Sequence, residues 1–468
     1  MKSLSNTFSY ATIGSLGLIG IALCIFPGAP LWSSLFQMLG ILVITLFVYR
    51  KVCPETAAGR WILLAVWTIL GIGFALNVWY YTTYSGGTLE APVVTRDALN
   101  IWTQIQNLYH TGNTKGGTMA DYARLIYYLN IGGTPTVNSY IVLSILSLLL
   151  TMIFTGAFAA YASGSSDLTS RRRISTMTML LMACITHFIG RGDLFTKDII
   201  CCLIMSLALY AIARLTDRNK PWISIIILVC CGIAAYYARP HLLIFSCIAF
   251  FLLCFVTPRK NMIIPVVVIL LFILLYWLSM QKSYVTFLVN NDGTTEFSLV
   301  DDNEKRMAAF SQVIPDYENA GILRKILYLP FTMAVQFLIP LPWSTGDLIE
   351  YGPTLAIARF TYPWYLIGGI IIFYLIRCIR RSPKGIMLAA LFGLIATAAT
   401  AYVTGGTVSR YCLLWLPALV PCAAWVLTSG RYKEKDFRIW AWIYGSVLVI
   451  GLIIVAVCLH IYSPGGWG

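Results

Sequence analysis

The chain is built largely from apolar runs long enough to cross a lipid bilayer, for which a helix needs about 20 mostly apolar residues. Only 11% of its 468 residues are charged, against about 25% in soluble domains. So much apolar surface does not fit into one soluble core. This excludes a soluble enzyme, a secreted disulfide scaffold and a disordered chain. The runs are 9–26, 31–49, 61–84, 138–162, 174–190, 195–214, 221–238, 241–256, 262–280, 360–377, 384–404, 408–427 and 438–462.

These runs predict an all-α polytopic membrane protein, with residues 1–468 forming a single integral-membrane domain of about 13 transmembrane helices. Charge predicts the orientation. If the N-terminus is cytoplasmic, the segments on that side hold 20 of the 33 Lys and Arg but 5 of the 19 acidic residues. Because Lys and Arg are retained in the cytoplasm, topology explains the net charge of +14. We therefore expect membrane lipids as partners and no nucleic acid.

The first long segment on the predicted outer side, 85–137, contains two amphipathic patterns. Apolar residues recur at helical spacing from Asp97 to His110, and a second short helix is predicted over Asp121–Leu129. Helices of this kind lie in the membrane interface. Asp97 is placed where an N-cap is expected, so it either caps the helix or serves as a general base or metal ligand.

The second long outer segment, 281–359, combines an acidic loop with a proline-rich apolar stretch over 326–342. Since proline breaks helices and restricts the preceding residue, we expect a re-entrant or interfacial segment there rather than a further span. Trp343 follows directly. It is either an interfacial anchor or a platform on which a sugar ring stacks.

Several polar and charged residues gather at the predicted outer ends of spans, where ionisable groups are costly and mark functional sites by default. Arginine presents a planar fork that matches phosphate, and histidine moves protons near neutral pH. The alternatives are an ion pair between adjacent Lys and Asp, and arginines that reach to lipid headgroups. The residues are Arg191, Lys197, Asp198, Tyr237, Arg239, His241 and Arg410.

No cofactor motif accompanies these residues. The 13 cysteines lie in or beside spans, without CxxC or Cys/His metal spacing, and buried cysteine acts as a small apolar side chain. There is no Walker loop or GxGxxG fingerprint. We predict no resident cofactor and leave a divalent metal open.

Five short motifs, in their order along the chain, resemble those of a family of bacterial membrane proteins of surface-polysaccharide synthesis, the C-type glycosyltransferases and O-antigen polymerases. The resemblance covers roughly 90–420. It departs at Ser344, where an acidic residue often follows the Trp. The motifs are Asp97, Lys197-Asp198, Arg239-Pro240-His241, Pro340-Leu341-Pro342-Trp343 and Gly406-Thr407…Arg410.

The resemblance implies glycosyl transfer from a polyprenyl-phosphate- or diphosphate-linked saccharide at the outer face of the cytoplasmic membrane, with a lipid-linked donor and acceptor. In that scheme Asp97, Asp198 and His241 are catalytic. Phosphate binding falls to Arg191, Lys197, Arg239 and Arg410, and sugar binding to Trp343 and Tyr237.

Two other function classes stay open at this point. A transporter or flippase of lipid-linked saccharides would show internal repeats and charges near mid-membrane. A scaffold without catalysis would show no convergent polar site. The unusual charges here cluster at helix ends and no repeat is evident, which favours the enzyme.

Overall fold

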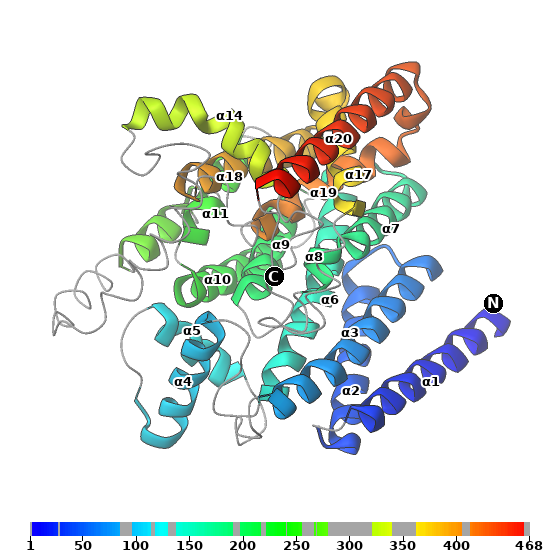
Figure 1. Ribbon diagram of the computed structural model, residues 1–468, viewed down its shortest axis with the longest axis vertical. Helices are drawn as coiled ribbons and strands as arrows, with labels where there is room; N and C mark the ends of the chain where they lie inside the picture. Colours follow the sequence, from blue (N-terminus) through cyan, green and yellow to red (C-terminus); the bar gives the residue numbers. More distant parts are fainter. Residues whose placement is uncertain are drawn as a thin grey trace.

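The computed structural model describes most of the chain and is shown in Figure 1. All regular structure in these residues is helical, without a β-strand. The described residues are 2–26, 29–84, 96–113, 118–129, 137–190, 197–216, 221–239, 241–254, 266–267, 269–278, 321–338, 362–404 and 412–462.

The helices follow the apolar runs closely. A further helical stretch covers 269–278, and α17 continues as a π-helical turn, Tyr374–Cys378, and a 3-10 turn, Ile379–Arg381. The remaining bounds are α1 Lys2–Ile25, α2 Leu31–Val52, α3 Ala57–Tyr84, α4 Arg96–Thr111, α5 Thr118–Leu129, α6 Val137–Ala162, α7 Leu168–Cys184, α8 Thr186–Ile189, α9 Lys197–Thr216, α10 Pro221–Ala238, α11 His241–Cys254, α14 Ile322–Leu338, α17 Tyr362–Phe373, α18 Lys384–Thr404, α19 Cys412–Thr428 and α20 Lys435–Tyr462.

The predicted fold class, an all-α polytopic membrane protein, is confirmed. Seven helices among the described residues are long and apolar enough to cross a membrane, and three shorter apolar helices accompany them. Each of the thirteen predicted runs contains helix. The number of spans and their orientation stay predictions.

The centre of the bundle is formed by α6 and α9, which pack against each other and against α7, α10 and α19. Small side chains on both central helices, such as Ala157 and Ala208, are fully buried and allow this close packing. Helices α1, α2 and α20 instead expose large apolar side chains, including Trp32 and Trp442 at 80% and 79% exposure. Such surfaces suit a lipid solvent.

Two amphipathic helices, α4 and α5, lie within the segment 85–137 and pack against each other, at the lower left of Figure 1. Their buried faces carry Ile101, Trp102 and Ile105 on α4 and Tyr122 on α5. Of the two alternatives for Asp97, an N-cap of α4 does not fit, because the helix already includes Arg96. The predicted start of α5 at Asp121 is three residues late.

The expectation that proline interrupts 326–342 is wrong at Pro330, which lies inside α14. The Pro330 side chain is exposed, and a freed backbone carbonyl is tolerated where neighbouring groups can relax. The described part of this helix ends at Leu338. Pro340 and Pro342 lie outside the described residues.

A close approach between α18 and α6 gives a first testable prediction. A Cβ atom added at Gly385 would lie 2.5 Å from the backbone oxygen of Ala162. We expect Gly385→Ala to lower the free energy of unfolding by about 1–3 kcal/mol, the usual cost of overpacking, measured by denaturant titration of the purified protein in detergent.

The matched control is Gly445→Ala in α20, where an added Cβ meets nothing within 4 Å. It should leave stability unchanged or raise it slightly, since alanine is the better helix former. Equal stabilities for the two variants would contradict the packing of α18 on α6.

Candidate functional site

A buried ion pair joins the beginning of α9 to the end of α10. Arg239 Nη2 lies 3.5 Å from Asp198 Oδ1. The Arg239 side chain is 10% exposed and the Asp198 side chain 3%. Two predicted site residues that are 41 positions apart in the sequence thus meet inside the protein.

The local sequence places each partner. Asp198 is the second residue of α9. The Arg239 amide donates to the Ala235 carbonyl, and the Arg239 carbonyl accepts from the Leu242 amide, both at 2.9 Å. Pro240 follows in the sequence and disfavours helical continuation at the residue before it. Arg239 is therefore held at the joint between α10 and α11, beside the start of α9.

The helix ends favour these charges. A carboxylate is stabilised near a helix N-terminus and a cation near a C-terminus, the positions that Asp198 and Arg239 occupy. Mutual attraction offsets part of the desolvation cost of burying each group, which for a lone buried charge is several kcal/mol. If either member were removed, the other would remain as a lone buried charge and would destabilise the folded protein.

A tyrosine from the predicted outer segment completes this arrangement. Tyr122 on α5 is 2% exposed, and α5 packs against α10. Burial raises the pKa of the Tyr122 phenol well above its usual range; the charges of Cys201 and Asp198 raise it further, while Arg239 lowers it. The phenol therefore stays protonated and lies within electrostatic reach of both members of the pair.

Sequence reasoning did not single out Tyr122. The signal was present in the spacing of Tyr122, Ala123 and Ile126, which form the buried face of α5. That periodicity indicates which face of an interfacial helix is covered, but not which span it covers.

The other predicted site residues have different outcomes. Tyr237 is half-buried near the end of α10, its ring centroid 5.2 Å from that of Tyr236. The backbone places Asp97 on α4, Lys197 at the start of α9 and His241 at the start of α11, but their side chains lie outside the described residues. The remaining predicted residues, Arg191, Trp343 and Arg410, also lie outside them.

A metal site is not evident in the described part of the chain. No group of three or more His, Cys, Asp or Glu side chains in it could hold a metal ion. Asp97 and His241, two of the predicted catalytic residues, are not covered by this finding because their side chains are not described.

An aromatic cluster that the sequence analysis missed joins α8, α14, α17 and α19. The Trp364 ring centroid lies 5.6 Å from His187 and 5.7 Å from Trp415. Phe337 stacks 6.0 Å from Trp364, whose Nε1 donates to the Phe337 carbonyl at 2.8 Å. His187 is 3% exposed, so it is a core residue. It is not among the predicted site residues.

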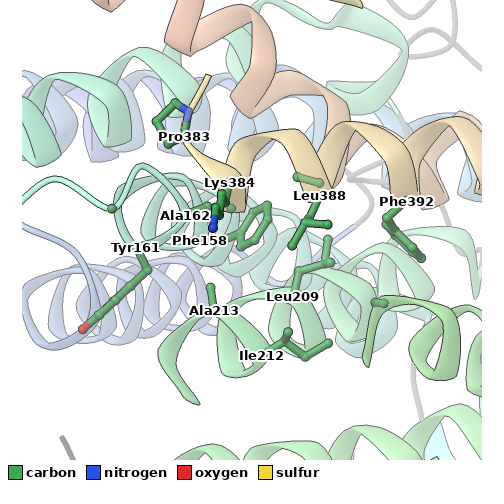
Figure 2. A pocket seen from close by; sticks show the side chains of 14 residues that line it. Phe158, Tyr161, Ala162, Leu209, Ile212, Ala213, Pro383, Lys384, Leu388 and Phe392 are labelled. Carbon is green, nitrogen blue, oxygen red and sulfur yellow. The ribbon is translucent and has the colours of Figure 1, made fainter. Parts of the chain in front are cut away.

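A separate apolar cavity of about 190 Å³ lies between α6, α9 and α18 (Figure 2). Leu388 of α18 points toward Leu209 of α9, and Ile212, Lys384 and Phe392 also line the cavity. Leu209 is 11 residues after Asp198, a rise of roughly 17 Å along a helix. This cavity is therefore not part of the site around the ion pair.

Comparisons with protein-family models, with curated proteins and with solved structures find no match to this chain.

The ion pair generates a second prediction. Asp198→Asn and Arg239→Gln should each lower the free energy of unfolding by about 3–5 kcal/mol, because each leaves one uncompensated buried charge. The double variant should be more stable than either single variant, since no lone charge remains. Denaturant titration in detergent measures the coupling.

The half-exposed pair Arg60–Glu55, 3.6 Å apart, provides the comparison. Glu55→Gln should cost less than about 1 kcal/mol, as exposed pairs contribute little. If Asp198→Asn cost no more than Glu55→Gln, the pair would not be buried as described.

Proposed function

We propose that this chain is a membrane glycosyltransferase of surface-polysaccharide synthesis that uses polyprenyl-phosphate- or diphosphate-linked sugars. The observation that carries the proposal is the meeting of Asp198 and Arg239 at 3.5 Å. These residues come from two of the sequence motifs that resemble the C-type glycosyltransferase and O-antigen polymerase family, the Lys-Asp pair and the Arg-Pro-His hairpin.

The chemistry suits such a site. In glycosyl transfer, the acceptor oxygen forms a bond to the anomeric carbon while the bond from that carbon to the phosphate oxygen breaks. The acceptor proton goes to a carboxylate, for which Asp97 and Asp198 are the candidates. The departing phosphate takes the electron pair, and Arg239 can neutralise its charge.

The other predicted residues extend this assignment. Arg191, Lys197 and Arg410 would contribute to phosphate binding, His241 would carry a proton, and the sugar would contact the aromatic residues Tyr237 and Trp343. The Tyr122 phenol, kept protonated by its burial, would donate a hydrogen bond beside Asp198.

The charge distribution supports a place in the bacterial cytoplasmic membrane, with the N-terminus in the cytoplasm and the active site facing outward. In this orientation α4 and α5 lie on the outer side, with α5 packed against α10, the helix that ends beside Arg239. Donor and acceptor would approach from the outer leaflet, where a polyprenyl chain can remain in lipid.

The position of the pair favours an enzyme over the alternative, a flippase of lipid-linked saccharides. Transporters place their charged sites near the bilayer midplane on interrupted helices. Asp198 instead lies in the first turn of α9, a continuous helix of 20 residues. The charged groups therefore sit at a helix end, within reach of a headgroup.

A transfer assay tests the proposal. Purified protein incubated with polyprenyl-linked sugars should yield elongated product, detected by chromatography. Asp97→Asn should reduce the rate by about 10²–10⁴-fold if Asp97 is the base, and Arg239→Ala should abolish product. The double variant Asp198→Asn/Arg239→Gln should fold and still be inactive.

Asp167→Asn is the matched control, because Asp167 is an exposed carboxylate that caps α7 at the other end of the bundle. It should retain full activity. Full activity in both Asp97→Asn and Arg239→Ala would refute the site. Movement of labelled lipid-linked sugar across vesicles without elongation would favour the flippase.

A further inference from the structure

A groove of about 570 Å³ lies at the end of the bundle opposite the ion pair. Its walls come from the first turns of α3 and α7 and from the turn that joins α19 to α20. The charge distribution predicts this end to be cytoplasmic. The proposed transfer chemistry makes no use of this groove.

One face of α7 forms the first wall. Thr169, Arg172, Arg173 and Thr176 line the groove, and their spacings of three, one and three residues place them on one side of a helix. Their neighbour Arg171 is engaged elsewhere, with its guanidinium carbon 4.5 Å from the centroid of the Tyr161 ring.

The opposite wall depends on a tight turn after α19. Gly430 has φ of 78°, a left-handed conformation that glycine adopts readily at helix ends. It turns the chain into the 3-10 helix Arg431–Lys433, which places Lys433 in the lining of the groove. Thr428, at the end of α19, also lines the groove. Three cationic side chains thus converge from two separate elements.

Among the described residues that line this groove, none is acidic. The acids nearest in sequence to the lining are already engaged. Asp167 accepts from the amides of Thr169 and Ser170, Glu434 pairs with Arg431, and Glu55 pairs with Arg60. Within the described part of the chain, neither Arg172 nor Arg173 makes an ion pair. The groove therefore presents uncompensated positive charge beside hydroxyl donors, the chemistry that binds phosphate.

The groove changes from polar to apolar along α7. Met177, Leu180 and Leu427 continue it beyond the threonines and arginines. Leu180 is 41% exposed and follows Thr169 by 11 residues, a rise of roughly 17 Å. A soluble anion would leave this apolar part unused, whereas an acyl chain would cover it.

We propose that this groove binds an anionic phospholipid. Its phosphate headgroup would be held by Arg172, Arg173 and Lys433, and the part of one acyl chain nearest the headgroup would lie along Met177 and Leu180. A cytoplasmic leaflet supplies such lipids. One headgroup would connect the N-terminal turns of α3 and α7 to the turn between α19 and α20. This connection would stabilise the folded bundle.

Lipid titration of the full-length protein in neutral detergent tests this site. Native mass spectrometry and the apparent unfolding temperature should report binding of phosphatidylglycerol in preference to phosphatidylcholine. The triple variant Arg172→Gln/Arg173→Gln/Lys433→Gln should weaken phosphatidylglycerol binding by about tenfold or more, given the contribution of each basic residue.

The matched control removes the same charge elsewhere at the same predicted face. Arg380→Gln/Arg381→Gln/Lys435→Gln changes three cationic residues outside the groove lining and should leave the affinity unchanged. Equal losses in both triple variants would show that only overall charge matters, and would overturn the proposal.

A second pair of variants leaves charge, and hence topology, untouched. Thr169→Trp should fill the mouth of the groove and abolish the preference for phosphatidylglycerol. Leu168→Trp, at a neighbouring side chain that is 51% exposed and outside the groove lining, should not. Undiminished binding in folded Thr169→Trp would contradict the site.

Inorganic phosphate and glycerol 3-phosphate distinguish a lipid from a soluble ligand. At the concentration at which phosphatidylglycerol raises the unfolding temperature, neither should have an effect. If either raised it equally, and the groove variants abolished that effect, the lipid assignment would be overturned in favour of a soluble phosphate ligand.

Discussion

The cost of leaving a charge in hydrocarbon is the constraint on which the rest of the structure depends. It forces charged side chains to helix ends, or into pairs. Asp198 and Arg239 satisfy both conditions, because Asp198 lies at the start of α9, Arg239 follows the end of α10, and the two lie 3.5 Å apart. At the opposite end, Arg172 and Arg173 near the start of α7 line a groove together with Lys433 from the turn after α19.

The same constraint explains the hydrogen bonds that several polar residues make inside the bundle. Gln336 on α14 exchanges hydrogen bonds with Thr400 on α18 at 3.0 and 3.2 Å. Hydroxyls on α6, such as that of Thr151, donate to the carbonyl four residues earlier at 2.7 Å. Because lipid offers no hydrogen bonds, these contacts hold polar side chains within the protein and leave apolar faces toward the membrane.

The ion pair and the cationic groove lined by Arg172, Arg173 and Lys433 mark two chemically distinct ends of the protein. The first is dry and nearly neutral, with α5 packed on α10 beside Asp198 and Arg239. The second is open and positive, and its charges are not paired within the groove. Under the proposed function, the first end would react with a lipid-linked sugar, while the second would hold the protein in an anionic leaflet.

The apolar runs by themselves determined the class of protein and the location of its helices. A run of about 20 apolar residues is long enough to cross a bilayer, and in lipid its backbone groups must be hydrogen-bonded internally, which a helix achieves. They also determined that Asp198 and Arg239 lie near helix ends. Only the tertiary structure decided that these two residues pair, that Tyr122 is buried within electrostatic reach of them and that Pro330 is accommodated within α14. Periodicity reports which face of a helix is apolar, but the contacts between helices depend on packing between segments distant in sequence, which no local pattern specifies.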